Sequence, residues 1–413
     1  MASDEGAAVG ADGADRALAA RTAGRVIVAL VVGQLGLHAA MAGLRLAASL
    51  QALREGASAW TVGLLLALFA AAPVLLALHA GRLADRHGYH RPVHLAVAVT
   101  VAGVLFAVLA TFVTGGWHFA LLCAAATCAG TGANIGMLTI QRTAGAEATD
   151  ATERVRVFSW LGIAPSFANV IGPVAVGFMI DAYGFRAGYL LLLVLPLATL
   201  ASARAVPRRP PPAPARPAQP RKAWELLHAP GLARLLSVNW LLAMCWDVHA
   251  FAVPVLGHER GYSASTIGLI LGTFTLSVSG VRLLIPLLAH RLAALVVLRG
   301  AMIGTAFVFA AYPFAPNPLV MGALAALLGI TLGSVQPMIM TMLHQLTPDQ
   351  RHGEALALRS MAMNASSTVM PLVFGATGAL VGAGLLFWAV GCAVGAGSWL
   401  ASRLAPALAR PAA

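Results

Sequence analysis

Charge is scarce in this sequence. Asp, Glu, Lys and Arg make up only 10% of its 413 residues, whereas soluble domains carry roughly 25%. Hydrophobic residues make up 59%, and the mean hydropathy is +0.81. Because so few polar side chains could not cover a soluble core, the composition excludes a soluble globular protein. Lipid must surround most of the chain, so the bilayer is its first expected partner.

The sequence also lacks the motifs of metal, disulfide and nucleotide chemistry. Its four cysteines lie singly in apolar runs without a CxxC pair, so we interpret them as small buried hydrophobic residues. There is no P-loop and no HExxH or DxD pattern. We therefore expect no cofactor, no metal site and no catalytic residues. Without a P-loop, the expected energy source is an ion gradient, most simply of protons.

Basic residues outnumber acidic ones, and the net charge is +12. We nevertheless expect no nucleic-acid partner, because the basic residues separate apolar runs instead of clustering on one domain. Loops that follow the positive-inside rule show this pattern.

The apolar runs are long enough to cross the hydrocarbon layer, which needs about 20 residues of helix. They predict an all-α polytopic membrane protein with twelve spans. The predicted spans are residues 24–46, 59–80, 92–114, 117–140, 156–180, 186–205, 232–254, 264–288, 293–314, 317–343, 355–381 and 383–404.

Arginine placement predicts the orientation of these spans. The connections 81–91, 141–156 and 204–222 are rich in arginine, whereas the alternate connections are nearly bare. We therefore expect both termini and the central connection in the cytoplasm, and the protein in a bacterial-type plasma membrane.

The spans divide six and six around a proline-rich segment, residues 207–220, which should be extended. The expected units are a disordered cytoplasmic tail (1–22), an N-terminal six-helix half (23–206), a Pro/Arg-rich linker (207–228), a C-terminal six-helix half (229–405) and a C-terminal tail (406–413).

An internal repeat relates the two halves. Residues 56–69 match residues 261–274 at eight of fourteen positions, an offset of 205. At a second offset, 198, residues 172–177 correspond to residues 370–375. Parallel halves of this kind are a transporter architecture.

The connection between the second and third spans resembles the signature loop of the major facilitator superfamily, G-x-L-A-D-R-x-G-R-R/K. With the span count and the half-repeat, this resemblance implies that superfamily's fold over residues 23–405, twelve helices in two pseudo-symmetric halves. In the superfamily this loop holds the cytoplasmic side closed, and in the second half His290 replaces the acid. The candidate gating residues are Gly81, Leu83, Asp85, Arg86, Gly88 and Arg91.

A second resemblance lies in the fifth span. Gly162, Gly172, Pro173 and Gly177 resemble part of the Gly/Pro pattern of the superfamily's proton-coupled antiporters. Gly and Pro permit a kink or close packing against another helix. Ordinary small-residue packing is the alternative interpretation.

The first span carries a polar stripe. Gln34, His38 and Arg45 recur at helical spacing, and polar groups in hydrocarbon are functional candidates. His38, near mid-membrane, could bind substrate, carry a proton or only bond a carbonyl. Arg45, near the predicted outer end, could bind an anionic group or extend to the interface.

The seventh span contains Asp247, the one acid well inside a predicted span, with Asn239, Trp246 and His249. A carboxyl that gains and loses a proton is what proton coupling requires. Alternatively, Asp247 pairs permanently with Arg45 or attracts a cationic substrate. Trp246 either stacks on substrate or anchors at the interface.

The remaining candidates are the isolated amides Asn134, Gln336 and Asn364, which line the pathway or bond neighbouring helices. We expect Arg282 to extend to the interface. We assign Glu354 and Arg359 to a cytoplasmic salt-bridge network outside the pathway.

These features predict a secondary active transporter, working as a monomer, that moves a small-molecule substrate by alternating access. The fifth-span pattern favours proton-coupled efflux of a hydrophobic or amphipathic compound. Uptake of a small organic solute by proton symport is the close alternative. A membrane-embedded enzyme and a transport-dead receptor are remote alternatives.

Overall fold

A computed structural model describes residues 2–147, 151–208, 223–288, 293–348 and 351–408, with side chains over most of these ranges. Their helices form the all-α polytopic fold predicted from the sequence. The N-terminal half contains α1 (Ala2–Arg54), α2 (Ala59–His87), α3 (His90–Ala110), α4 (Gly115–Glu147), α5 (Ala151–Leu192) and α6 (Val194–Ala203). The C-terminal half contains η1 (Ala223–His228), α7 (Leu232–Glu259), α8 (Ala264–Leu288), α9 (Ala294–Ala311), η3 (Tyr312–Phe314), α10 (Pro318–Gln345), α11 (His352–Val381), α12 (Ala383–Ser402) and α13 (Ala405–Leu408).

Within the described ranges, ten helical segments are long and apolar enough to cross a membrane. The difference from the twelve predicted spans has two sources. One segment, Trp160–Ala203, contains both the fifth and the sixth span, and Gly184 breaks it between them with φ 83° and ψ 174°. The other source is α11, which is less apolar because Asn364, Ser366, Ser367 and Thr368 lie in it. With these two included, the described helices supply twelve crossings.

The described residues cover the expected tails and linker only in part. α1 begins at Ala2, and the disordered tail expected over residues 1–22 stays a prediction. Of the predicted linker, residues 223–228 form η1 and residues 209–222 lie outside the described residues. The same is true of residues 409–413 in the predicted C-terminal tail.

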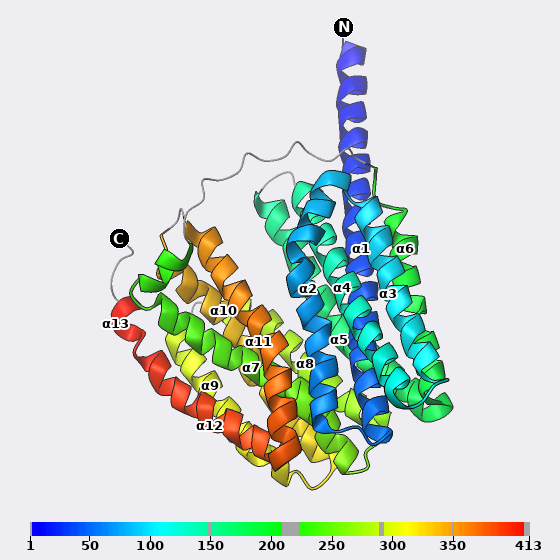
Figure 1. Ribbon diagram of the computed structural model, residues 1–413. Helices are drawn as coiled ribbons and strands as arrows, with labels where there is room; N and C mark the ends of the chain where they lie inside the picture. The colour runs from blue at the N-terminus through cyan, green and yellow to red at the C-terminus, as the bar shows by residue number, and fades with distance from the viewer. Residues whose placement is uncertain (1, 148–150, 209–222, 289–292, 349–350, 409–413) are drawn as a thin grey trace.

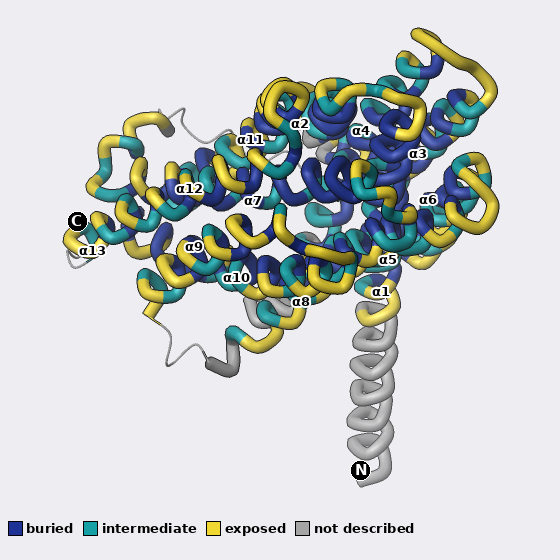
Figure 2. Tube along the Cα trace, turned by 90° about the horizontal axis from the view of Figure 1, so that it is seen from below, coloured by how far each residue is buried: buried dark blue, intermediate teal, exposed yellow. Residues whose placement is uncertain are grey.

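The outside of the bundle is apolar. Leu75, Trp117, Leu319 and Leu380 are exposed over 77%, 78%, 84% and 85% of their surfaces. Figure 2 shows the buried residues in the interior, where helices cross, and exposed residues along the outward-facing turns. Large apolar side chains on the outside suit contact with lipid.

The two halves lie side by side (Figure 1), and their most extensive contacts join α5 to α8 and α2 to α11. In both pairs the backbones meet. A Cβ atom on Gly268 would lie 2.6 Å from the carbonyl oxygen of Pro173, and one on Gly63 would lie 2.3 Å from that of Pro371. Only glycine permits so close an approach.

These two contacts are built from the sequence repeats. Gly63 and Gly268 are equivalent at the offset of 205, and Pro173 and Pro371 are equivalent at the offset of 198. Both contacts lie at the end of the bundle where α2 and α8 begin, which we call the outer end. The opposite end, where α6 ends and η1 begins, is called the linker end.

A polar contact accompanies the α5–α8 pair at the outer end. The carboxylate of Asp181 accepts hydrogen bonds from the backbone N–H groups of Ala264 (3.0 Å) and Ser265 (2.7 Å) in the first turn of α8. The guanidinium of Arg54 lies 3.8 Å from the same carboxylate. Asp181 therefore caps a helix of the other half. The equivalent position near the α2–α11 contact is Ala379, which has no such group.

Candidate functional site

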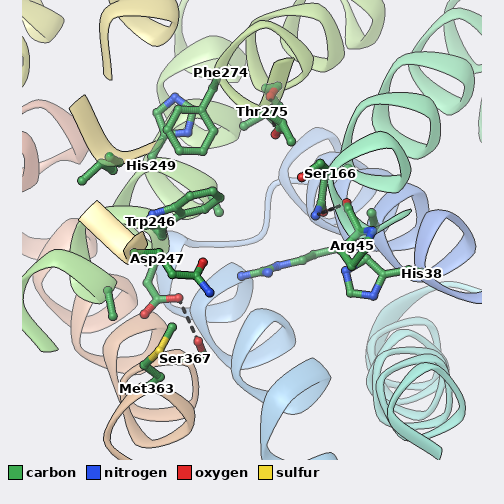
Figure 3. Close-up of a pocket in the computed structure, with 18 of the residues that line it drawn as sticks. His38, Arg45, Ser166, Trp246, Asp247, His249, Phe274, Thr275, Met363 and Ser367 are labelled. Atoms are coloured by element: carbon green, nitrogen blue, oxygen red, sulfur yellow. Dashed lines mark hydrogen bonds between the residues drawn. The ribbon is translucent and has the colours of Figure 1, made fainter. Parts of the chain in front are cut away.

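A cavity of about 460 Å³ lies between the halves, within the size range of small-molecule sites. Its walls come from α1 and α5 on one side and from α7, α8, α10 and α11 on the other. Figure 3 shows polar side chains from several of these helices converging on it. The polar and ionisable lining residues are His38, Arg45, Ser166, Asn169, Asn239, Trp246, Asp247, His249, Thr275, Arg282, Gln336, Arg359 and Ser367.

The carboxylate of Asp247 is held by two hydroxyl groups of α11. Ser366 donates to its Oδ2 at 2.7 Å, and Ser367 donates to its Oδ1 at 3.2 Å (Figure 3 draws the second bond). Asp247 itself is only 6% exposed. Both bonds therefore lie within the C-terminal half and fix the carboxylate against α11.

Arg45 reaches from α1 across the cavity toward Asp247 (Figure 3). Their charges attract each other, but in the described part of the chain no ion pair within 4.0 Å joins them. The prediction that Arg45 lies near the outer end is wrong. α1 continues to Arg54, and at 1.5 Å per residue the nine further residues place Arg45 about 14 Å below the end of the helix.

Aromatic side chains form the wall beside Asp247. Trp246 meets the ring of Phe274 edge-on at 4.7 Å between centroids, so it lies in the cavity wall and not at the membrane interface. His249 is buried against the same ring at 4.4 Å, and its Nε2 lies 3.1 Å from the Tyr312 hydroxyl. His38, half-buried on α1, lines the opposite side of the cavity.

Two arginines line the cavity toward the linker end. Arg359 on α11 donates from Nε to Oδ1 of Asn239 at 3.2 Å. Arg282 on α8 donates from Nη2 to Oε1 of Gln336 at 2.9 Å. These bonds connect α11 to α7 and α8 to α10.

The expected placements of Arg359 and Arg282 are therefore wrong. Glu354 pairs with Arg351, at 2.5 Å, and not with Arg359. The reason is helical geometry, because five residues of α-helix turn Arg359 roughly 140° away from the face that carries Glu354. Arg282 binds an amide of the neighbouring helix instead of extending to the interface.

Three of the ten candidates for binding substrate or protons lie outside the cavity wall. Gln34 is buried in α1, and its Oε1 has no hydrogen-bond partner. Asn134 on α4 donates to the carbonyl of Pro73 at 3.5 Å, across to α2. Asn364 is exposed on α11. The structure brings the other seven candidates together around one space.

The fifth-span residues have different surroundings. A Cβ atom on Gly172 would lie 2.3 Å from the carbonyl oxygen of Ala39 on α1, and one on Gly177 would lie 2.6 Å from that of Ala264 on α8. Pro173 lines the cavity. Gly162 is exposed, and a Cβ there would meet nothing within 4 Å. Close packing thus involves Gly172 and Gly177 but not Gly162.

The candidate gating loop is a tight turn between α2 and α3. Gly88 has a φ of 68°, and its N–H bonds the carbonyl of Ala84 at 3.1 Å. Of the candidate residues, Leu83 is half-buried, and Arg86 and Arg91 are exposed. The exposure of Gly81, the side chain of Asp85 and all of His290 are not described, so the gating role of this loop stays a prediction.

Sequence reasoning missed Ser366 and Ser367, because hydroxyl residues are unremarkable in an apolar run. One signal could have indicated the pairing. Asn239 and Asp247 are eight residues apart on α7, and their partners Arg359 and Ser367 are eight apart on α11. When two parallel helices make two contacts with each other, the contacting residues are spaced equally on both helices.

Comparison with known proteins agrees with this architecture. No curated protein matches the sequence. Similar solved structures include a POT family transporter in complex with a thioalcohol-conjugated peptide, with 11% identity and a TM-score of 0.70 over 93% of this chain and 96% of that chain. A bacterial homologue of the iron transporter ferroportin in an inward-facing state is similar at 17% identity and a TM-score of 0.70, over 94% of this chain and 99% of that one. A variant of the nucleoside transporter NupG is similar at 12% identity and a TM-score of 0.68, over 91% of this chain and 99% of that one.

The sequence itself matches the model of one protein family in both halves. The matched segments are residues 28–245 and 235–412, which together include every helix that lines the cavity. The chain therefore belongs to the Major Facilitator Superfamily, and it is a multi-pass membrane transporter of a small molecule and not an enzyme.

Proposed function

We propose that this transporter couples substrate movement to protons and that Asp247 carries the proton. The supporting observation is the position of this carboxylate between the halves. Ser366 and Ser367 bind it from its own half, whereas Arg45 approaches from the other half. When one half rocks against the other, the serines move with Asp247 and Arg45 does not. A nearby positive charge favours the ionised carboxylate, so conformation and protonation become linked.

The proposed cycle is alternating access. The glycine contacts bring the halves together at the outer end, while Asn239, Arg282 and Arg359 line the cavity toward the linker end. We infer that substrate reaches the cavity from the linker end in this state. Arginine placement predicts that this end faces the cytoplasm, which supports an inward-facing state. Loop 81–91 would then close the linker end in the opposite state.

The cavity suits an amphipathic cargo. Apolar side chains of Leu242, Leu271, Phe274 and Leu332 lie beside its polar groups. We propose efflux as the direction, on the resemblance of the fifth span to the superfamily's antiporters. Uptake by proton symport is the second candidate, because it would use the same carboxylate and the same cavity.

Proton flux in proteoliposomes tests the proposal. Purified protein is reconstituted with the pH dye pyranine inside, a pH gradient is imposed, and a panel of amphipathic acids, amines and neutral compounds is added. We expect at least one compound to cause proton movement in the wild type. Asp247→Asn, which keeps the size and hydrogen-bond acceptor of the side chain, should abolish gradient-driven movement.

Glu354→Gln is the matched control, because Glu354 pairs with Arg351 away from the cavity. It should transport like the wild type. If the wild type binds a compound but shows no flux of it, the protein is a receptor and the proposed transport mechanism is wrong. Unchanged gradient-driven flux in Asp247→Asn would remove this residue from coupling. The sign of the proton movement separates efflux by exchange from symport.

A further inference from the structure

We propose that the cavity binds a small organic anion and that Arg282, Arg359 and Asn239 form its anion-binding group. The inference names the substrate class of the proposed transport function and rests on that function for movement, though not for binding. It is argued from charge, from hydrogen-bond donors without acceptors, and from the shape of the cavity.

The charge balance of the cavity is positive. Three arginines line it, namely Arg45, Arg282 and Arg359, against a single carboxylate, Asp247. An arginine stays protonated in proteins, so no change of protonation can remove these three charges. In the described part of the chain none of the three forms an ion pair within 4.0 Å. Uncompensated charge is costly inside a membrane protein, and an anionic ligand would supply the missing counter-charge.

The buried polar atoms that lack hydrogen-bond partners also indicate an anionic ligand. Three of them belong to residues that line the cavity: Nε of Arg45, Nε of Arg282 and Nδ2 of Asn239. All three are hydrogen-bond donors. Buried donors are normally satisfied, and each exception calls for an explanation. A ligand rich in acceptor oxygens, such as a carboxylate or a phosphate group, would satisfy them.

The contacts of Asn239 fix which of its amide atoms faces the ligand. Arg359 donates to Oδ1, so the donor atom Nδ2 is left for another partner. Arg282 is held in a similar way, because Gln336 accepts from one of its terminal nitrogens only. The two guanidinium groups are also close enough to repel each other. An anion between two arginines relieves this repulsion and can be bound by the guanidinium forks.

The rest of the cavity accommodates an apolar body. Beyond the arginines, the wall contains Trp246, Phe274, Leu271 and Val335. A space of about 460 Å³ is enough for a ligand of modest size. The substrate class that fits both parts is an organic anion with a carboxylate or phosphate group on an apolar body.

Ligand-induced thermal stabilisation of the full-length protein in detergent tests this site without requiring transport. The probes are size-matched sets of different charge: benzoate, phenyl phosphate, benzamide and benzylamine, with aliphatic sets of three to eight carbons. We expect carboxylates or phosphates to stabilise the wild type, and their amide and amine counterparts not to do so. Benzoate against phenyl phosphate separates the two anion chemistries.

The arginine variants assign the binding to this group. Arg282→Gln and Arg359→Gln should each weaken anion binding roughly ten- to hundredfold, the range for a charged hydrogen bond. The Lys variants, which keep the charge but lose the fork, should retain part of it. Arg299→Gln is the matched control, since Arg299 is exposed on α9 and outside the cavity. Melting temperatures without ligand identify any variant that fails to fold.

The outcomes are distinct. Stabilisation of the wild type by amines, or by no anion of the panel, overturns the proposal. Anion binding that survives both Gln substitutions places the site elsewhere and also overturns it. If anions bind through these arginines but cause no proton-coupled flux, the anion site stands and the transport proposal falls. If only neutral or cationic compounds are transported, the transport proposal stands and the anion site falls.

Discussion

The two serines that bind Asp247 differ in their surroundings. Ser366 is fully buried and donates at 2.7 Å, whereas Ser367 is half-buried and donates at 3.2 Å. Removing a donor from a buried charged acceptor costs about 1.5–3 kcal/mol, but a site that water can reach loses less. The position of the carboxylate should therefore depend mainly on one of its two partners.

Serine-to-alanine substitution measures this difference. We expect Ser366→Ala to lower the unfolding temperature of the purified protein more than Ser367→Ala does, because only the first leaves the carboxylate without a replacement donor. Thermal unfolding in detergent, followed by tryptophan fluorescence, gives both values under one set of conditions. An equal loss in the two variants, or the opposite order, would show that burial does not govern these bonds.

At the level of single residues, the sequence identified ionisable candidates better than it predicted where their side chains lie. It identified Asp247 and His38 as candidates, and both line the cavity. It placed Arg282 at the interface, because an arginine near the end of a span usually extends there, and it placed Arg359 in a salt-bridge network with Glu354. Which face of a helix meets the partner half depends on packing between helices that are distant in sequence, so spacing alone could not assign these two residues.

Helix pairs at the outer end differ in polar support although their backbone contacts are equivalent. The α5–α8 pair has Asp181 across the first turn of α8, and the α2–α11 pair has Ala379 at the corresponding place. A carboxylate that caps a helix is worth about 0.5–2 kcal/mol. Because this cap joins the two halves, it stabilises only states in which the outer end is closed.

Asp181→Ala should therefore shift the transporter toward an open outer end, by roughly two- to thirtyfold in the equilibrium constant. Spin labels at the exposed outer positions Trp117 and Phe314, in a background without native cysteines, report the distance between the halves. Arg54→Gln is the control, since its contact is longer, at 3.8 Å, and partly exposed, and such pairs contribute little. An unchanged distance distribution in Asp181→Ala would show that the cap has no role in closure.

The sequence repeats relate the residues that meet at the outer end, whereas hydropathy misplaced one helix end there. The offsets of 205 and 198 relate residues that form equivalent contacts. Hydropathy ended the first span at residue 46, yet α1 continues to Arg54. Gln51 accepts a hydrogen bond from Tyr189 there, and Arg54 lies over the ring of Phe185. These partners are distant in sequence, so the hydropathy of one segment could not predict them.

For the whole molecule, alternating access requires the outer contacts to separate in every cycle. A crosslink between α2 and α11 should block transport while leaving the cavity intact. The pair Ala59→Cys with Gly378→Cys suits this purpose, because a Cβ on Gly378 would lie 3.7 Å from Cβ of Ala59, close to the mean for a disulfide.

Oxidation of this double variant, in a background without Cys123, Cys128, Cys245 and Cys392, should abolish flux in proteoliposomes, and a reductant should restore it. Each single-cysteine variant is the matched control and should remain active under oxidation. Ligand binding to the oxidised protein should persist if, as proposed, the cavity is reached from the linker end. Full transport by the crosslinked protein would contradict alternating access through this contact.

The overall fold was predictable from the sequence, because span length, loop charge and the repeat are each properties of the chain itself. The superfamily match in both halves confirms that prediction. The conformational state was not predictable, since it reflects a small free-energy difference between two packings of the same helices. Gly63 and Gly268 permit the close contact of the closed outer end, but they do not determine how often it forms.

The outer closure formed at Gly63 and Gly268 has one further consequence. Its closest approaches are made by the main chain, with the carbonyl oxygens of Pro173 and Pro371 against glycine. The residues that line the cavity lie almost entirely outside these two contacts, and only Pro173 belongs to both. Substitutions in the cavity could retune what is carried while the seal stays as it is, which makes this scaffold a suitable starting point for redesigning transport specificity.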